Sequence, residues 1–234
     1  MSDTLQVALV AEGPTDRIVV EAALGAVMKG RDFVLKQLQP EGSVAFGPLG
    51  GGWTGVYRWC KQAAVRAGGR FADDVLFRTY DLLILQLDAD TADKEYSDGN
   101  IEPEPGDGTL PCAKPCPPAS ATTDALRAVL LTWCAETRTP PRTVICMPSK
   151  STEAWVVAAL YPGDASLRKT IECLPDPVAR LGQQPKGKRI RKAQRDYQDR
   201  QADIQKAWGR LVAREGLGEA RRFQEEFLAA APAG

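Results

Sequence analysis

The sequence predicts an α/β fold in which a mostly parallel β-sheet is covered by helices on both faces. Two short, continuous apolar runs, Val7–Ala11 and Leu82–Leu87, are typical of buried parallel strands. Segments with helical spacing alternate with strand-like runs up to about residue 160, as in a series of β-α-β units. Beyond Pro162 the pattern becomes polar and helical, which predicts a C-terminal helical extension packed on the sheet.

Hydrophobic periodicity and turn residues predict the individual elements. Thr15 is the expected N-cap of the first helix, with Asp16 in its first turn. Thr91–Ser120 is rich in Pro, Gly and acidic residues and has no periodicity, so we expect a long irregular insertion there. In chain order we expect a strand at Leu5–Ala11, a helix at Thr15–Met28, a strand at Phe33–Leu38, a glycine-rich loop at Gly47–Gly55, a helix at about Val56–Ala67, a strand at Leu82–Leu87, a helix at Thr122–Glu136, a strand at Thr143–Met147, a helix at Thr152–Leu160 and helical structure to about Leu228. These elements predict an α/β domain over residues 1–162, interrupted by the insertion at 91–120, and a helical extension over residues 163–234.

The composition is that of a globular protein. The chain has 234 residues, of which 44% are hydrophobic and 26% are charged, enough to bury a sizeable core. The 30 Lys and Arg residues balance the 30 Asp and Glu residues, so the net charge does not itself indicate a nucleic-acid partner. The sequence has no apolar run of membrane-spanning length and no secretory signal pattern. We therefore expect a cytoplasmic location and no membrane partner.

Acidic side chains follow the predicted strands. Glu12 comes directly after the first strand, where Gly13 is expected to let the backbone turn sharply. Asp88 and Asp90 follow the strand Leu82–Leu87 and point to the same side if the chain stays extended. Ligands of open α/β sheets collect at the carboxyl ends of the strands, so we expect these carboxylates to converge. Carboxylates crowded together repel one another unless a hard divalent ion such as Mg²⁺ lies between them.

Asp16 and Glu153 are further candidate ligands, and each has a purely structural alternative. Asp16 either projects towards Glu12 or only complements the N-terminus of its helix. Glu153 lies in "PSKSTEAW" after a third strand, where it either helps to hold a second ion or forms a capping box with Ser151 or Ser149. The pattern predicts a phosphoryl-transfer site for one or two Mg²⁺ or Mn²⁺ ions, with Glu12, Asp16, Asp88, Asp90 and Glu153 as metal ligands.

A basic cluster lies in the predicted extension. The segment "KGKRIRK" contains five cationic residues in seven, namely Lys186, Lys188, Arg189, Arg191 and Lys192. Charge runs are often solvated faces. Beside a metal site that acts on phosphodiesters, however, this run would bind a nucleic-acid backbone in a salt-sensitive way. Trp53 and Trp59 either stack on bases or, as large apolar rings more often do, pack in the core.

Histidine and cysteine usage narrows the chemistry. The chain contains no histidine, which excludes Ser-His-Asp and Cys-His catalysis and histidine-based metal sites. Cys60, Cys134 and Cys146 lie in apolar surroundings and are expected to be reduced core residues. Cys112 and Cys116 are spaced like half of a zinc site, but the sequence offers no second pair at ligand spacing.

The acidic motifs together resemble those of a known family. Glu12 after the first strand and the later Asp88-x-Asp90 resemble the TOPRIM domain of topoisomerases, bacterial primases, recombination proteins and several nucleases. Over about Leu5–Leu160 the chain most resembles nucleases of the overcoming-lysogenisation-defect (OLD) type and the small stand-alone bacterial TOPRIM proteins related to them. Asp16 and Glu153 match the remaining acidic positions in chain order. The resemblance implies a TOPRIM, Rossmann-like sheet.

The same resemblance implies the chemistry and the setting. It implies a Mg²⁺- or Mn²⁺-dependent nuclease in which Asp88 and Asp90 are the central ligands and Glu12 is a ligand or a general base. A lysine further along the chain assists at the phosphate in those nucleases; Lys186, Lys188 and Lys192 are candidates, and we assign Lys188 to the catalytic set. The implied context is DNA processing or defence against phage, with nucleic acid, chiefly DNA, as partner.

Further partners and other functions stay open. The chain lacks a GxxxxGK[ST] motif, so the ATPase of OLD proteins would be a separate subunit, and a homo-oligomer is compatible with the sequence. One alternative is a metal-dependent nucleotidyl or glycosyl transferase that uses Asp88-x-Asp90 and leaves Glu12 and Glu153 without a role. Another alternative is a catalytically silent TOPRIM subunit of a larger complex. The residues do not distinguish DNA from RNA or endonuclease from exonuclease action.

Overall fold

The protein forms one four-stranded parallel sheet with the strand order β2-β1-β3-β4. The computed structural model describes residues 4–41, 48–163, 171–213 and 216–232. The strands are β1 (Leu5–Val10), β2 (Phe33–Gln39), β3 (Leu82–Gln86) and β4 (Thr143–Cys146). β1 pairs with β2 on one side and with β3 on the other, and β3 pairs with β4, all in parallel. The predicted α/β class with a parallel sheet is confirmed.

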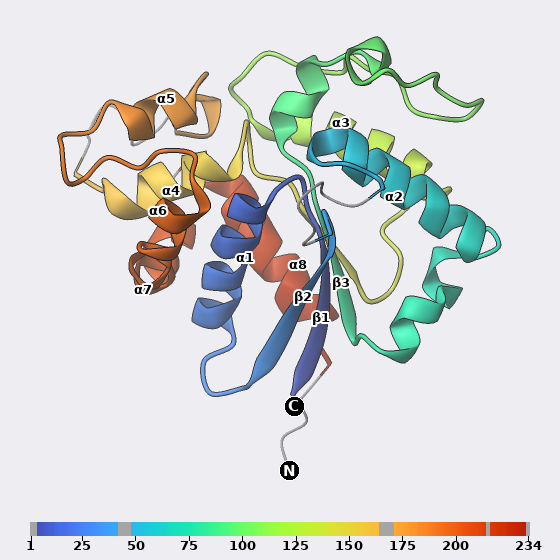
Figure 1. Cartoon of the computed structure of the whole chain (residues 1–234), viewed down its shortest axis with the longest axis horizontal. Coiled ribbons are helices and arrows are strands. Elements are labelled where there is room, and N and C mark those ends of the chain that lie inside the picture. Colours follow the sequence, from blue (N-terminus) through green and yellow to red (C-terminus); the bar gives the residue numbers. More distant parts are fainter. Residues whose placement is uncertain (1–3, 42–47, 164–170, 214–215, 233–234) are drawn as a thin grey trace.

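Helices cover both faces of this sheet (Figure 1). Leu5, Val7 and Leu9 of β1 face a core that they share with helices α1, α4, α7 and α8. Ala8 and Val10 face the opposite core, which contains α2 and α3. This alternation follows from the two-residue period of side chains along a strand. The helices are α1 (Pro14–Val27), α2 (Gly52–Arg66), α3 (Ser120–Trp133), α4 (Thr152–Leu160), α5 (Pro177–Gly182), α6 (Gln194–Gln198), α7 (Gln201–Val212) and α8 (Gly218–Ala230). None of the helices in the described ranges has both the length and the apolar character needed to cross a membrane.

The C-terminal helices share their core with the sheet domain. Trp155 of α4 is fully buried, and its ring centroid lies 5.4 Å from that of Trp208 in α7. The ring of Phe223 in α8 stacks on Trp155 with a centroid distance of 6.0 Å. Buried aromatic side chains dominate the energetics of such cores. Helices α7 and α8 therefore bury the same face of the sheet as α1 and α4.

The segment between β3 and α3 is irregular but well packed. Within residues 91–119 the structure has no α-helix or strand, and two 3₁₀ turns, Ala89–Asp93 and Tyr96–Gly99, lead into it. The hydroxyl of Tyr96 accepts a 2.9 Å hydrogen bond from the indole N–H of Trp133 in α3. Asp107 accepts a 2.8 Å hydrogen bond from the hydroxyl of Tyr57 in α2. These contacts fasten the insertion to the helices of one face.

Helix α2 begins at Gly52, four residues before the predicted start at Val56. The expected loop to Gly55 is therefore too long, because the chain turns into the helix early enough to bury Trp53. The rings of Trp53 and Trp133 lie 6.4 Å apart, and those of Trp59 and Phe71 lie 6.3 Å apart. Both α2 tryptophans are buried, so they pack in the core as the more frequent alternative predicted.

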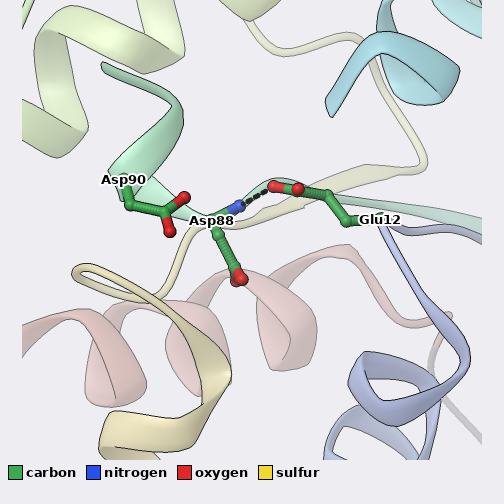
Figure 2. A group of neighbouring side chains, drawn as sticks. All are labelled: Glu12, Asp88 and Asp90. Carbon is green, nitrogen blue, oxygen red and sulfur yellow. Dashed lines mark hydrogen bonds between the residues drawn. The ribbon is translucent and has the colours of Figure 1, made fainter. Parts of the chain in front are cut away.

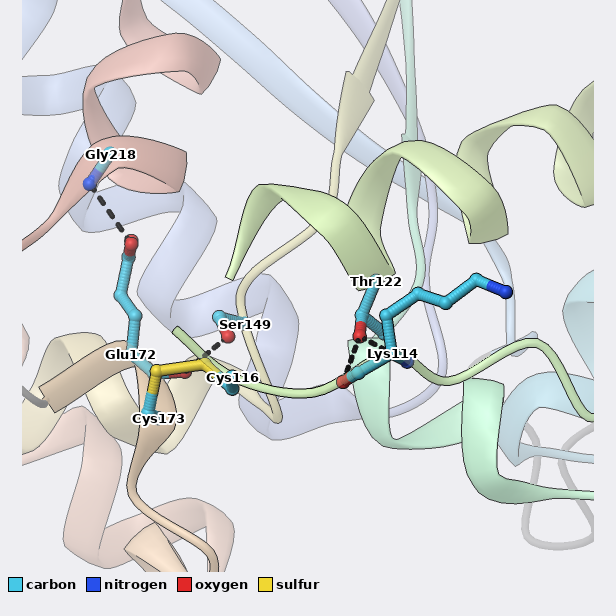
Figure 3. The surroundings of a disulfide bond; sticks show 7 residues. All are labelled: Lys114, Cys116, Thr122, Ser149, Glu172, Cys173 and Gly218. Carbon is cyan, nitrogen blue, oxygen red and sulfur yellow. Dashed lines mark hydrogen bonds between the residues drawn. A yellow bond between two sulfur atoms is a disulfide. The ribbon is translucent and has the colours of Figure 1, made fainter. Parts of the chain in front are cut away.

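A disulfide joins Cys116 of the insertion to Cys173 (Figure 3). The Cys116 thiol is therefore not available to form half of a zinc site with Cys112. Next to the disulfide, the carboxylate of Glu172 accepts a 3.0 Å hydrogen bond from the backbone N–H of Gly218 at the start of α8. The three cysteines expected in the core, Cys60, Cys134 and Cys146, are buried free thiols as predicted.

Candidate functional site

The carboxyl ends of β1 and β3 bring Glu12 and Asp88 together (Figure 2). The two strands are neighbours, with Val10 opposite Leu85, so they end at the same edge of the sheet. The backbone N–H of Asp88 donates a 2.7 Å hydrogen bond to the Glu12 carboxylate. One carboxylate oxygen each from Glu12, Asp88 and Asp90 lies within 4.8 Å of the other two. The predicted convergence of these three residues is confirmed.

Gln86 at the end of β3 holds both strand ends in place. Its side-chain oxygen accepts a 3.0 Å hydrogen bond from the backbone N–H of Glu12. Its side-chain nitrogen donates a 2.7 Å hydrogen bond to Asp88 Oδ1. The sequence analysis missed this role, although a glutamine inside the apolar run "LLILQL" is a recognisable signal because buried polar groups need partners.

Asp16 lies beside this group in the first turn of α1 and is buried. The hydroxyl of Thr152 donates a 2.6 Å hydrogen bond to Asp16, and the backbone N–H of Thr152 donates to Asp88 Oδ1 at 3.3 Å. Thr152 therefore joins the first turn of α4 to both acidic motifs. Asp16 does more than complement the N-terminus of its helix, because its carboxylate lines the same pocket as Glu12 and Asp88.

Gly13 serves this arrangement through its small size. The chain does turn here from β1 into α1, but the φ of Gly13, −151°, is extended and open to any residue, so the turn does not require a glycine. A Cβ atom at this position would lie 3.2 Å from Asp16 Oδ2. A larger residue would therefore push against the Asp16 carboxylate.

Glu153 is the most deeply buried of the five predicted ligands. Its side chain is fully buried, and Oε1 accepts a 2.7 Å hydrogen bond from the hydroxyl of Tyr197 in α6. Its Oε2 is buried and has no hydrogen-bond partner among the residues that the structure describes. Ser151 is the N-cap of α4 but makes no side-chain capping bond, so the predicted capping box does not form. Glu153 lies outside the group of three oxygens formed by Glu12, Asp88 and Asp90.

Burial and mutual repulsion raise the pKa values of the clustered carboxyl groups. Burial, followed by the charge of Asp16, raises the pKa of Glu12 to about 8. Burial, followed by the charge of Glu153, raises the pKa of Asp16 to about 6. Burial and the surrounding carboxylates raise the pKa of Asp88 well above its usual range. Near neutral pH the cluster therefore retains protons that a bound cation would displace.

Lys192 is the member of the basic cluster that reaches these carboxylates. Its Nζ lies 3.6 Å from Glu153 Oε1, and its side chain is 56% exposed. It lines a pocket of about 260 Å³ together with Glu12, Asp16 and Asp88. Desolvation lowers the pKa of Lys192, but the carboxylates, Glu153 foremost, raise it overall, so the ammonium group stays charged.

Lys188 lies away from this pocket and lines a different one, beside Tyr161 and Arg200. The reason is the turn at Gly187, whose φ of +90° redirects the chain between Lys186 and Lys188. Of these two candidate lysines, Lys192 and not Lys188 therefore lies at the carboxylates. The remaining cationic residues predicted to bind nucleic acid, Lys186, Arg189 and Arg191, are exposed.

Tyr197 is a further site residue that sequence analysis did not assign. It is buried, and burial together with the charge of Glu153 raises the pKa of its hydroxyl far above the ordinary value. The hydroxyl therefore remains protonated and donates to Glu153. Since the two residues are 44 positions apart, no local pattern in the sequence indicates this contact.

Comparisons of the chain with protein-family models, with curated proteins and with solved structures find no match. The resemblance to TOPRIM nucleases rests on the order of the acidic motifs, and the candidate site rests on the geometry described above.

Proposed function

We propose that this chain is a TOPRIM-type nuclease that hydrolyses phosphodiester bonds with Mg²⁺ or Mn²⁺. The observation that carries the proposal is the group of Glu12, Asp88 and Asp90, whose carboxylate oxygens lie within 4.8 Å of one another at neighbouring strand ends. Hard oxygen ligands of this kind suit Mg²⁺ and Mn²⁺. The proposal includes the setting that the resemblance implies, namely DNA processing or phage defence in the cytoplasm, with DNA and a separate ATPase subunit as partners.

The residues fit one divalent cation, and two more carboxylates are available for a second. Octahedral ligands 2.0–2.1 Å from Mg²⁺ lie about 2.9–4.2 Å from one another, so carboxylate oxygens within 4.8 Å of one another need to move only slightly inward to share one ion. Glu153 Oε2, buried without a hydrogen-bond partner in the described chain, has unused ligand capacity. A cation would also relieve the repulsion that raises the pKa values of Glu12, Asp16 and Asp88.

The side chains around the ion have separable tasks. When bound, the ion supplies Lewis-acid stabilisation of the charge that develops on the phosphate. Glu12 lines the same pocket and is the candidate general base; a bound ion would lower its metal-free pKa of about 8 and so leave the carboxylate ionised near neutral pH. Lys192 provides an exposed ammonium group at the same pocket for a phosphate oxygen. Gln86 and Thr152 orient Asp88 through their hydrogen bonds.

The test is cleavage of supercoiled plasmid and of labelled DNA and RNA oligonucleotides in Mg²⁺, Mn²⁺ or EDTA. We expect cleavage that requires metal and is lost in Asp88→Asn. The matched control is Asp93→Asn, which removes an exposed carboxylate from the same segment and only breaks a 3.0 Å ion pair with Lys150. Full cleavage by Asp88→Asn would contradict the proposal.

Two other outcomes would favour the competing functions. Metal binding with transfer from a nucleotide or nucleotide-sugar, and no cleavage, would indicate the transferase. A wild-type protein that neither cleaves nor gains melting temperature from metal would indicate the catalytically silent subunit.

A further inference from the structure

A second pocket lies on the helical extension, lined by residues of α7, of the end of α4 and of the loop that carries the basic cluster. Its volume is about 430 Å³. Its lining includes the ring of Tyr161, the cationic side chains of Lys188, Arg200, Lys206 and Arg210, and one carboxylate, Asp203. We refer to it as the α7 pocket. None of these residues belongs to the pocket over the carboxylates.

In the part of the chain that the structure describes, cations outnumber carboxylates in the lining of the α7 pocket. Asp203 lies 3.5 Å from Arg200 and neutralises part of its charge. Among the residues that the structure describes, no carboxylate is within ion-pair distance of Lys188, Lys206 or Arg210. The chain as a whole has no net charge, so this concentration of cations is a local property. Cations gathered in one concave site attract an anion and raise its local concentration.

The fold presents these cations together. Ile204 and Trp208 turn one face of α7 into the core. Lys206 and Arg210, four residues apart, lie on an exposed face of the same helix. Arg200 donates a 3.1 Å hydrogen bond to the backbone carbonyl of Gly187, which fastens the loop beside Lys188 to the start of α7.

A contact with α4 fixes the other side of the loop. The hydroxyl of Tyr161 donates a hydrogen bond to the backbone carbonyl of Lys188. The loop is therefore held by α4 and α7 at once, and it forms a defined wall of the pocket. The backbone of this wall therefore incurs no ordering cost on binding.

The same loop connects the α7 pocket to the metal centre. Lys188 lines the α7 pocket and Lys192, four residues later, lines the pocket over the carboxylates. Four residues span at most about 14 Å. Phosphates of one strand of a duplex advance by about 3.4 Å along the helix axis per nucleotide, so the Cα atoms of the two lysines lie no more than about four nucleotides apart.

We propose that the α7 pocket binds a phosphate group of the nucleic-acid strand whose scissile bond lies at the metal centre. The inference rests on the proposed function and specifies where its substrate is held. The planar guanidinium groups of Arg200 and Arg210 suit phosphate oxygens. An internal phosphodiester and a terminal phosphate offer the same chemistry, and the experiment distinguishes them.

The experiment measures binding in EDTA, where cleavage is not expected. Lys206→Ala with Arg210→Ala is compared with the wild type and with Lys36→Ala plus Arg138→Ala, which removes the same two charges from exposed positions outside the pocket. Fluorescence anisotropy of a 3′-labelled single strand is followed as a function of salt. We expect the salt slope of the pocket variant to fall by about 0.7, the value for one lost phosphate contact on a single strand, and that of the control to stay at the wild-type value.

Two forms of the strand identify the phosphate. Equal loss of binding with 5′-phosphorylated and 5′-hydroxyl strands indicates an internal phosphodiester, whereas a loss confined to the phosphorylated strand indicates the terminal phosphate. Equal salt slopes for the pocket variant and the control would overturn the proposal. If the alanine variant melts below the wild type, the glutamine pair Lys206→Gln and Arg210→Gln replaces it.

The two proposals fail in different ways. A changed salt slope without cleavage by the wild type would refute the nuclease proposal and support phosphate binding in the α7 pocket. Metal-dependent cleavage with an unchanged salt slope would refute phosphate binding in the α7 pocket and support the nuclease proposal.

Discussion

Replacing Asp88 by Asn separates charge repulsion from metal binding at one position. Asp88 is only 5% exposed, and its Oδ1 accepts from Gln86 and Thr152, bonds that an asparagine Oδ1 retains. Two unit charges 4.8 Å apart, the limit within the site, repel by about 3.5 kcal/mol at an effective dielectric constant of about 20. Because the raised pKa values leave neighbouring groups partly protonated, we expect the metal-free variant to gain about 1–2 kcal/mol in unfolding free energy.

This gain should reverse when metal is added. A free-energy change of 1 kcal/mol shifts the melting temperature of a chain of this size by about 2–4 °C. An ion at 100 times its Kd that binds only the folded wild type adds about 2.7 kcal/mol, and the variant, lacking a ligand, gains little. Calorimetry in EDTA and in Mn²⁺ should therefore find the variant melting above the wild type without metal and below it with metal.

The control for this crossover is Asp93→Asn, which replaces a carboxylate that is 51% exposed. It should follow the wild type in both conditions. A lower melting temperature of Asp88→Asn in EDTA would refute the idea that the carboxylates are crowded. An undiminished rise with metal would refute the assignment of Asp88 as a ligand.

Three further predictions concern the same site. The folded-state pKa of Glu12, about 8, lies above its ordinary value of 4.5, so the folded protein binds more protons than the unfolded chain between these pH values. The stability of the metal-free protein should therefore fall as the pH rises from 4.5 to 8. A melting temperature in EDTA that rises over this pH range would contradict the raised pKa of Glu12. Lys192→Ala should lower kcat roughly a hundredfold, as loss of one phosphate-stabilising cation does, whereas Lys188→Ala should mainly raise KM. Steady-state cleavage kinetics, with Lys36→Ala as control, measure both effects. The reverse pattern would mean that the assignment of the two lysines is wrong. Tyr197→Phe leaves both oxygens of Glu153 without a hydroxyl donor, so the unfolding free energy measured in urea should fall by about 1–3 kcal/mol. Adding Glu153→Gln should restore part of this loss. An unchanged urea midpoint would mean that the Tyr197–Glu153 hydrogen bond does not contribute to stability.

The convergence of Glu12 and Asp88 was predictable because each follows a continuous apolar run. Such runs become buried parallel strands, and neighbouring parallel strands end at the same edge of the sheet. The insertion at 91–120 was equally clear from its lack of periodicity, although its packing through Tyr96 and Asp107 was not.

The choice between Lys188 and Lys192 could not be made from the sequence. The two lysines have the same charge and are four residues apart in one cluster. Which of them reaches the carboxylates depends on the left-handed turn at Gly187 and on the burial of Ile190. Similarly, no pattern in the sequence indicates that Tyr197 is buried with Glu153 as its partner. Contacts between distant segments depend on how the helices dock on the sheet.

The disulfide between Cys116 and Cys173 closes a covalent ring around α3, β4 and α4, the helix that carries Glu153. A bond between residues 57 positions apart restricts the unfolded chain, and the chain-entropy relation gives a stabilisation of about 4 kcal/mol. Thiols are kept reduced in the cytoplasm, where the same chain would fold without the disulfide and without this stabilisation. Material purified in air and material kept under reductant would thus differ in heat resistance while sharing one folded core. Their melting temperatures describe two covalent species and should be reported separately.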